Sequence, residues 1–202
     1  MSLSSDSGKI RSFIAIELPD EVKDGLSRLK SKMSSREGTF VKWVDIDEIH
    51  LTLKFLGNIY SEQIAEIAEA IKGASQGIHP FQLRISGLGA FPNLKQPRVV
   101  WVGVFGETDK LLRLQQSIDS ALLFLGLAKE ERPFTPHLTL ARVRQGASSL
   151  QIKGFSDLVT SSSFENDCYF KVESVNLMKS QLTPQGAIYT RLSSARLEVQ
   201  KI

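Results

Sequence analysis

The chain is poor in the residues that build disulfides and metal centres. Its 202 residues include one cysteine, Cys168, and three histidines. A single cysteine excludes an intramolecular disulfide framework and fits a reducing compartment. The histidines lack the close spacing to other ligands, such as His-x-x-x-His, that is typical of metal sites. The sequence therefore predicts neither a bound metal nor a cofactor.

Long hydrophobic runs and dense charge are missing as well. No apolar stretch approaches the ~20 residues that cross a bilayer, and the polar N-terminus, MSLSSDSGK, lacks the apolar segment of a signal peptide. We therefore expect no membrane association and a cytoplasmic location. The net charge of +3 is compatible with a phosphate-bearing partner. Because no dense basic stretch is present, binding to long RNA should be modest and salt-sensitive.

Apolar periodicity predicts an alternation of strands and helices. Strands are expected over residues 13–18, 40–44, 50–56, 81–88, 98–104, 137–143, 172–178 and 187–192, and helices over residues 20–33, 61–73 and 108–126. Residues 146–160 fit either a short helix or a loop. Each half of the chain thus contains strand, helix, strand, helix or loop, and strand, with no linker between the halves.

This order predicts an α+β fold with two similar lobes, whose mostly antiparallel sheets and flanking helices surround a central cleft. We expect a flexible tail over residues 1–10 and a single bilobal domain over residues 11–202. The domain is expected to contain an internal pseudo-twofold duplication.

One tetrapeptide occurs twice in the strand-like segments. Residues 50–53 and residues 137–140 both read His-Leu-Thr-Leu. Successive side chains of a strand point to opposite faces, so each histidine shares a face with its threonine while the leucines face a core. If the two strands meet around a pseudo-twofold axis, two imidazoles and two hydroxyls converge on one site.

This set of groups suits the displacement reaction at a phosphodiester. Two histidines with pKa values near neutrality can act as base and acid, one neutral and one protonated. Threonine hydroxyls can donate to the phosphoryl oxygens where charge accumulates. A single histidine in such a strand is more often structural, but a chance repeat that begins at one of three histidines is expected only roughly 0.001 times. His79, which precedes Pro80 and has no threonine two residues on, is assigned no role.

The segments around both motifs resemble a known family. The segments FIAIELP, IHLTLKFLG, RVVWV and RPFTPHLTL, at residues 13–19, 49–57, 98–102 and 132–140, are similar to the four landmark segments of the two-histidine (2H) phosphoesterases. The similarity is greatest to the RNA 2′,3′-cyclic phosphodiesterases, also called 2′-5′ RNA ligases, and extends over residues 11–189.

The resemblance implies an enzyme that hydrolyses a terminal 2′,3′-cyclic phosphate to a 2′-phosphate without a metal. By analogy His50 protonates the leaving 3′-oxygen, His137 activates water, and Thr52 and Thr139 hold the phosphate. The near symmetry of the motifs leaves the allocation of acid and base open. The reverse of this chemistry accounts for the 2′-5′ ligation described for the family.

Three further residues are candidates for contact with the substrate. Arg142 lies where relatives carry an arginine near the phosphate or ribose, but its odd offset from His137 predicts the opposite face unless the strand ends or a bulge follows after Ala141. Phe13 matches an aromatic that can stack on a nucleobase, or else it is a core residue. Lys54 shares parity with His50 and is expected at the cleft rim or in solvent. Trp101 is expected in the core.

Two other functions stay open on the sequence alone. The fold can serve as a non-catalytic RNA-binding protein, which loss of a motif histidine would favour, or the histidines can bind a metal, which a metal requirement would reveal. The expected partners are an RNA with a 2′,3′-cyclic phosphate end or small cyclic nucleotides. We expect a monomer, because the whole motif set lies within one chain.

Overall fold

The computed structural model describes residues 8–34, 39–164, 168–183 and 186–198. The strands are β1 (Lys9–Glu17), β2 (Val41–Trp43), β3 (His50–Tyr60), β4 (Phe81–Phe91), β5 (Val99–Gly106), β6 (His137–Val143), β7 (Cys168–Val172), β8 (Ser174–Leu182) and β9 (Ala187–Arg196). The α-helices are α1 (Asp20–Ser34), α2 (Ile64–Ala74), α3 (Thr108–Leu123) and α4 (Ser149–Ser161), with short 3-10 helices η1 (Ile46–Glu48) and η2 (Ser61–Gln63). None of the helices in these ranges is long and apolar enough to cross a membrane.

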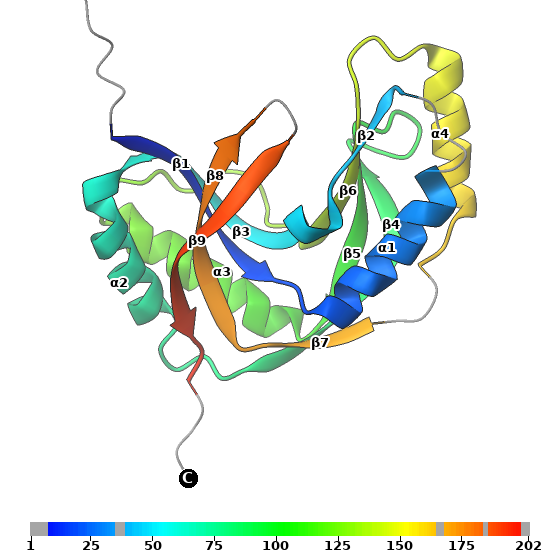
Figure 1. The fold of residues 1–202 in the computed structure, drawn as a ribbon. Coiled ribbons are helices and arrows are strands. Elements are labelled where there is room, and N and C mark those ends of the chain that lie inside the picture. Colours follow the sequence, from blue (N-terminus) through cyan, green and yellow to red (C-terminus); the bar gives the residue numbers. More distant parts are fainter. Residues whose placement is uncertain (1–7, 35–38, 165–167, 184–185, 199–202) are drawn as a thin grey trace, which may run out of the picture.

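The strands form two antiparallel sheets. Sheet A has the order β3-β1-β8-β9, and sheet B has the order β2-β6-β5-β4-β7. Figure 1 shows α2 and α3 beside sheet A, and α1 and α4 on the far side of sheet B, so that the two sheets lie between two pairs of helices. The predicted α+β fold with antiparallel sheets and flanking helices is confirmed.

Each sheet takes strands from both halves of the chain. Sheet A combines β1 and β3 with β8 and β9, whereas β4, from the first half, pairs with β5 in sheet B. Neither half can therefore complete a sheet without the other. Both lobes therefore contain strands from both halves of the chain. The shared strands do not contradict the internal duplication, which stays a prediction.

Several boundaries differ from those expected. Lys9 and Ile10 already lie in β1, so the predicted tail is wrong for these two residues, while residues 1–7 lie outside the described ranges. β3 does not end at Gly57 but continues to Tyr60. Gly57 has φ +70° and pairs with Ser12 beside a register shift. Glycine at a positive φ inside a paired strand marks a β-bulge as readily as a turn, which explains the error.

Two elements were undecided or missed in the sequence. Residues 149–161 form α4, which begins with reciprocal hydrogen bonds between Ser148 and Gln151. This capping box is visible in the sequence as Ser-x-x-Gln and favours a helix over a loop. Strand β7 was not expected, because its five residues alternate only weakly and are recognised mainly by their pairing with β4.

Candidate active site

The two repeated tetrapeptides begin the strands β3 and β6, which lie side by side where the sheets meet. All four motif leucines are buried in the main core: Leu51, Leu53, Leu138 and Leu140. The histidines and threonines are partly buried and alternate with these leucines. We call the face of each sheet that carries its histidine and threonine the motif face.

A β-bulge interrupts both motif strands at the same position. In sheet A, Thr52 pairs with Ala15 but Lys54 pairs with the next residue, Ile14, so Leu53 has no partner in the register. In sheet B, Leu140 is left out in the same way, between Thr139 and Ala141. A bulge reverses the alternation of side chains beyond it. The residue five positions after each histidine therefore lies on the motif face.

This reversal brings Arg142 to the motif face of sheet B, where it is exposed. The odd offset that argued against Arg142 is thus removed by a bulge at Leu140, one residue earlier than the sequence argument required. The counterpart in β3 is Phe55, whose side chain is 62% exposed. Phe55 was not singled out from the sequence, although its five-residue offset from His50 equals that of Arg142 from His137.

The imidazole of His50 is enclosed by aromatic rings. The ring of Phe13 stacks on it with 4.5 Å between the ring centroids, and the ring of Tyr189 meets it nearly at right angles at 5.0 Å. Burial lowers the pKa of His50 from 6.5 to about 4, and a hydrogen bond to the backbone carbonyl of Glu48 opposes this only in part. His50 is therefore a neutral imidazole at pH 7.

The imidazole of His137 has a similar arrangement in sheet B. Its Nδ1 lies 2.7 Å from the carbonyl oxygen of Thr135, so the neutral ring donates from Nδ1 and leaves Nε2 for a substrate. The ring of Phe91 lies edge-on at 4.9 Å, and the indole of Trp101 is tilted at 6.3 Å. Each motif histidine is thus held by a pair of aromatic side chains.

The expectation that Trp101 is a core residue is wrong. Its backbone pairs with Thr139, and its indole lies across Gly89, where a Cβ atom would collide with the ring. Trp101 therefore belongs to the motif face of sheet B. Trp101 was expected in the core because its strand is rich in valine, whereas only the face with Val100, Val102 and Val104 is buried in the core.

Phe13 does not present an open face to a nucleobase. It is 3% exposed and forms a small apolar cluster with Ala15 and Met178, separate from the main core, against which Tyr189 packs. The cluster contacts the imidazole of His50 through the rings of Phe13 and Tyr189. The base-stacking role predicted for Phe13 is therefore corrected to a packing role, and Phe55, at 6.2 Å from Phe13, is the exposed aromatic nearby.

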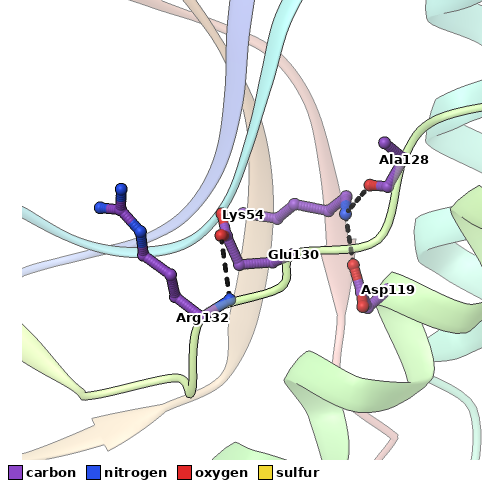
Figure 2. A network of polar contacts seen from close by, with 5 residues as sticks. All are labelled: Lys54, Asp119, Ala128, Glu130 and Arg132. Atoms are coloured by element: carbon purple, nitrogen blue, oxygen red, sulfur yellow. Dashed lines mark hydrogen bonds and ion pairs between the residues drawn. The ribbon is translucent and has the colours of Figure 1, made fainter.

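Lys54 lies neither at a rim nor in solvent. The bulge directs it into the core, where its ammonium group donates to the carboxylate of Asp119 in α3 and to the carbonyl oxygen of Ala128 at 2.6 Å (Figure 2). Both side chains of the ion pair are almost fully buried. The contact to Ala128 anchors the loop that leads from α3 toward His137. The predicted contact of Lys54 with substrate is therefore wrong.

No group of three or more His, Cys, Asp or Glu side chains that would hold a metal ion is found within the described ranges.

Comparison with known proteins identifies relatives over nearly the whole chain. The family model of the LigT-like phosphoesterases matches this sequence over residues 16–101 and again over residues 104–189. The RNA 2′,3′-cyclic phosphodiesterase of Methanothermobacter thermautotrophicus is 32% identical over 94% of this chain and 100% of its own length. The enzyme of the same name from Aeropyrum pernix is 36% identical over 83% of this chain and 92% of its own length.

Solved structures show the same arrangement of elements. A protein of Thermus thermophilus has a TM-score of 0.78 and 28% identity, covering 93% of this chain and 98% of its own. E. coli LigT, crystallised with 3′-AMP, has a TM-score of 0.75 and 25% identity, covering 94% of this chain and 98% of its own.

Removing the buried cation should destabilise the fold. Lys54→Met leaves Asp119 buried without its partner, and a loss of about 3–5 kcal/mol in the free energy of unfolding is expected. The double variant Lys54→Met/Asp119→Leu should regain most of it, measured by urea unfolding. The control Lys72→Met removes an exposed ammonium group 3.7 Å from the carboxylate of Glu69 and should change the free energy of unfolding little. Equal stability of both single variants would contradict a structural role for the buried pair.

The low pKa of His50 should make stability depend on pH. The unfolded chain binds a proton at this residue near pH 6.5 but the folded chain only near pH 4, so stability is full above the first value and is lost as the pH falls toward the second. The loss is at most about 3 kcal/mol. Between pH 6.5 and pH 4, the free energy of unfolding of His50→Gln, measured with urea, should therefore fall by up to about 3 kcal/mol less than that of the wild type.

The matched control for this titration is His79→Gln, which changes an exposed histidine. It should keep the pH dependence of the wild type. If His50→Gln also kept it, burial would not be holding His50 in its neutral form.

Proposed function

The chain belongs to the LigT-like phosphoesterase family, and we propose that it hydrolyses the 2′,3′-cyclic phosphate at the end of an RNA to a 2′-phosphate without a metal ion. The observation that carries this proposal is the pair of motif faces, each with a histidine and a threonine, on two adjacent strands. The names of the relatives from M. thermautotrophicus and A. pernix support the substrate class.

The proposed step is a displacement at phosphorus. A water molecule attacks the phosphorus while His137 accepts its proton, the bond between phosphorus and the 3′-oxygen breaks, and His50 gives a proton to that oxygen. The product carries a 2′-phosphate and a 3′-hydroxyl. Loss of a proton to solvent then restores the neutral His137, and His50 takes up a proton again when the next substrate binds. The two imidazoles supply both proton transfers, so the step needs no metal-bound water.

The environment of His50 suits the role of acid. Its imidazole is neutral before substrate binds, because burial holds its pKa near 4. A cyclic phosphate brings a negative charge, which raises the pKa of a nearby imidazole, so that substrate and proton bind together. An imidazolium ion in a poorly hydrated site is also a strong proton donor. The buried environment of His50 thus favours His50 as the acid and His137 as the base.

The phosphate itself is assigned to the hydroxyls and the guanidinium group. Thr52 and Thr139 share the motif faces with the histidines and can donate to the non-bridging oxygens. Arg142, exposed on the same face as His137, can donate in a bidentate manner to a phosphate whose charge increases in the transition state. Charge neutralisation by Arg142 replaces part of what a metal ion would provide.

The nucleoside is assigned to the side of Phe55. This ring is exposed beside the first motif, and stacking of a base on an aromatic ring is tolerant of base identity. Small 2′,3′-cyclic nucleotides should therefore be substrates as well as RNA ends. E. coli LigT binds 3′-AMP, which agrees with a site for one nucleotide. Attack by the 5′-hydroxyl of a second RNA in place of water, with the 3′-oxygen again as the leaving group, would give a 2′-5′ linkage.

The first test is a product analysis. A short RNA with a 2′,3′-cyclic phosphate end, incubated with the protein in EDTA, should yield only the 2′-phosphate, and His50→Ala and His137→Ala should each lower kcat at least ~100-fold. The control His79→Ala should keep the wild-type rate. A reaction that appears only after a divalent metal is added would replace the proposal by a metal-dependent one. Binding without turnover in either condition would indicate a non-catalytic RNA-binding protein.

A second test separates Arg142 from its neighbours. Arg142→Ala should lower kcat/KM for a 2′,3′-cyclic nucleotide about 30-fold or more, because a charge-assisted contact with the phosphate is lost. The kcat/KM of Arg142→Lys should lie between the values of Arg142→Ala and the wild type, since lysine keeps the charge but not the bidentate geometry. Arg144→Ala, two residues further on, is the matched control and should change kcat/KM less than about twofold. Equal losses at both arginines would point to general electrostatic attraction.

A further inference from the structure

Tyr189 lies on β9, the last strand within the described residues, and reaches the site from the side opposite to β3. The register pairs it with Ser180, and Ser180 pairs with Arg11 of β1, so Tyr189 lies on the motif face of sheet A. Its ring centroid is 5.0 Å from that of His50 with an interplanar angle of 88°. It also meets Phe13 at 5.1 Å and 78°.

These contacts complete a cage around the imidazole of His50. Phe13 covers one face of the imidazole in a stacked arrangement, with 25° between the rings, and Tyr189 closes a second side at a right angle. The carbonyl of Glu48 holds one ring nitrogen. Perpendicular and offset-stacked ring pairs stabilise each other beyond the area that they bury. Loss of the Tyr189 ring would therefore weaken the hold on the His50 side chain.

The hydroxyl of Tyr189 lies among charges from both sheets. Burial raises the pKa of this phenol, the carboxylate of Glu48 raises it further, and the guanidinium groups of Arg142 and Arg11 oppose the rise. The phenol therefore stays protonated through the working range of the histidines. Arg142 belongs to sheet B, so Tyr189 lies where the two motif faces approach each other.

We propose that Tyr189 is a positioning residue for the reaction, whose ring holds the imidazole of His50 in the orientation needed for proton transfer. This rests on the proposed function only in naming that reaction. The ring, not the hydroxyl, performs the task, because the contacts to His50 and Phe13 are ring contacts. A residue of the C-terminal strand thus completes a site whose recognisable motifs all lie before it.

The test compares Tyr189→Phe, which keeps the ring, with Tyr189→Leu, which removes it. With adenosine 2′,3′-cyclic monophosphate as substrate, Tyr189→Phe should keep kcat within about threefold, whereas Tyr189→Leu should lower kcat about 10-fold or more with little change in KM. NMR titration of the C2 proton of His50 supplies a second readout. Its pKa should stay near 4 in Tyr189→Phe and move toward 6.5 in Tyr189→Leu, because water reaches the ring.

The matched control is Ile188→Ala, which changes the neighbouring exposed residue on the opposite face of β9 and should leave both readouts unchanged. If Tyr189→Leu does not fold, Tyr189→Met keeps more of the volume without an aromatic ring and gives the same comparison. An unchanged kcat and an unchanged His50 pKa without the ring would overturn the proposal. So would a Tyr189→Phe variant as slow as Tyr189→Leu, since the hydroxyl would then be the active group.

The titration also separates the two proposals. If the wild type does not hydrolyse the cyclic nucleotide, the proposed function fails, but the His50 titration in the Tyr189 variants still reports whether the ring cages the imidazole. If the wild type is active and neither kcat nor the His50 titration changes when the ring is removed, only the positioning role fails.

Discussion

Backbone pairing along the two motif strands controls which side chains can meet a substrate. Each strand keeps strict alternation over histidine, leucine and threonine, and then loses it at one unpaired leucine, Leu53 or Leu140. Two consecutive side chains then face the core, and the next one returns to the motif face. The exposed position of Phe55 and Arg142 depends on this single extra residue. Without the bulge, both would point toward the helices, and a hydrophobic ring and a cation would have to exchange places with core residues.

The bulge at Leu53 also directs the side chain of Lys54 into the core. Its aliphatic stem lies in the core, and its ammonium group is held by Asp119 and by the carbonyl oxygen of Ala128 (Figure 2). The corresponding residue after the second bulge is Ala141, which is buried and needs no partner. The two motif strands thus share one backbone device and fill the space behind it differently. In the first strand the buried charge joins β3 to α3 and to the loop before His137.

Aromatic packing gives the two histidines comparable supports. His50 contacts Phe13 and Tyr189, and His137 contacts Phe91 and Trp101. In each case the supporting rings come from strands other than the one that carries the histidine. Imidazole orientation is therefore a property of the assembled sheets. Desolvation by the rings around His50 also explains why the pKa of His50 is low.

The sequence alone determined the features that depend on short-range order. The helices α1 and α3, the bounds of β6, the buried motif leucines and the shared face of each histidine and threonine all follow from periodicity within a few residues. The two copies of His-Leu-Thr-Leu also located the candidate site, since a chance repeat at histidine is rare. The tertiary structure decided the rest, because alternation predicts a face only as far as the first bulge, and a bulge is defined by the partner strand. For this reason Lys54 was misplaced, and the odd offset of Arg142 predicted the wrong face. Trp101 was misplaced for another reason, because only the valine face of its strand is buried. Tyr189 was missed because its contact with His50 joins two strands far apart in the sequence, which only the folded sheet brings together.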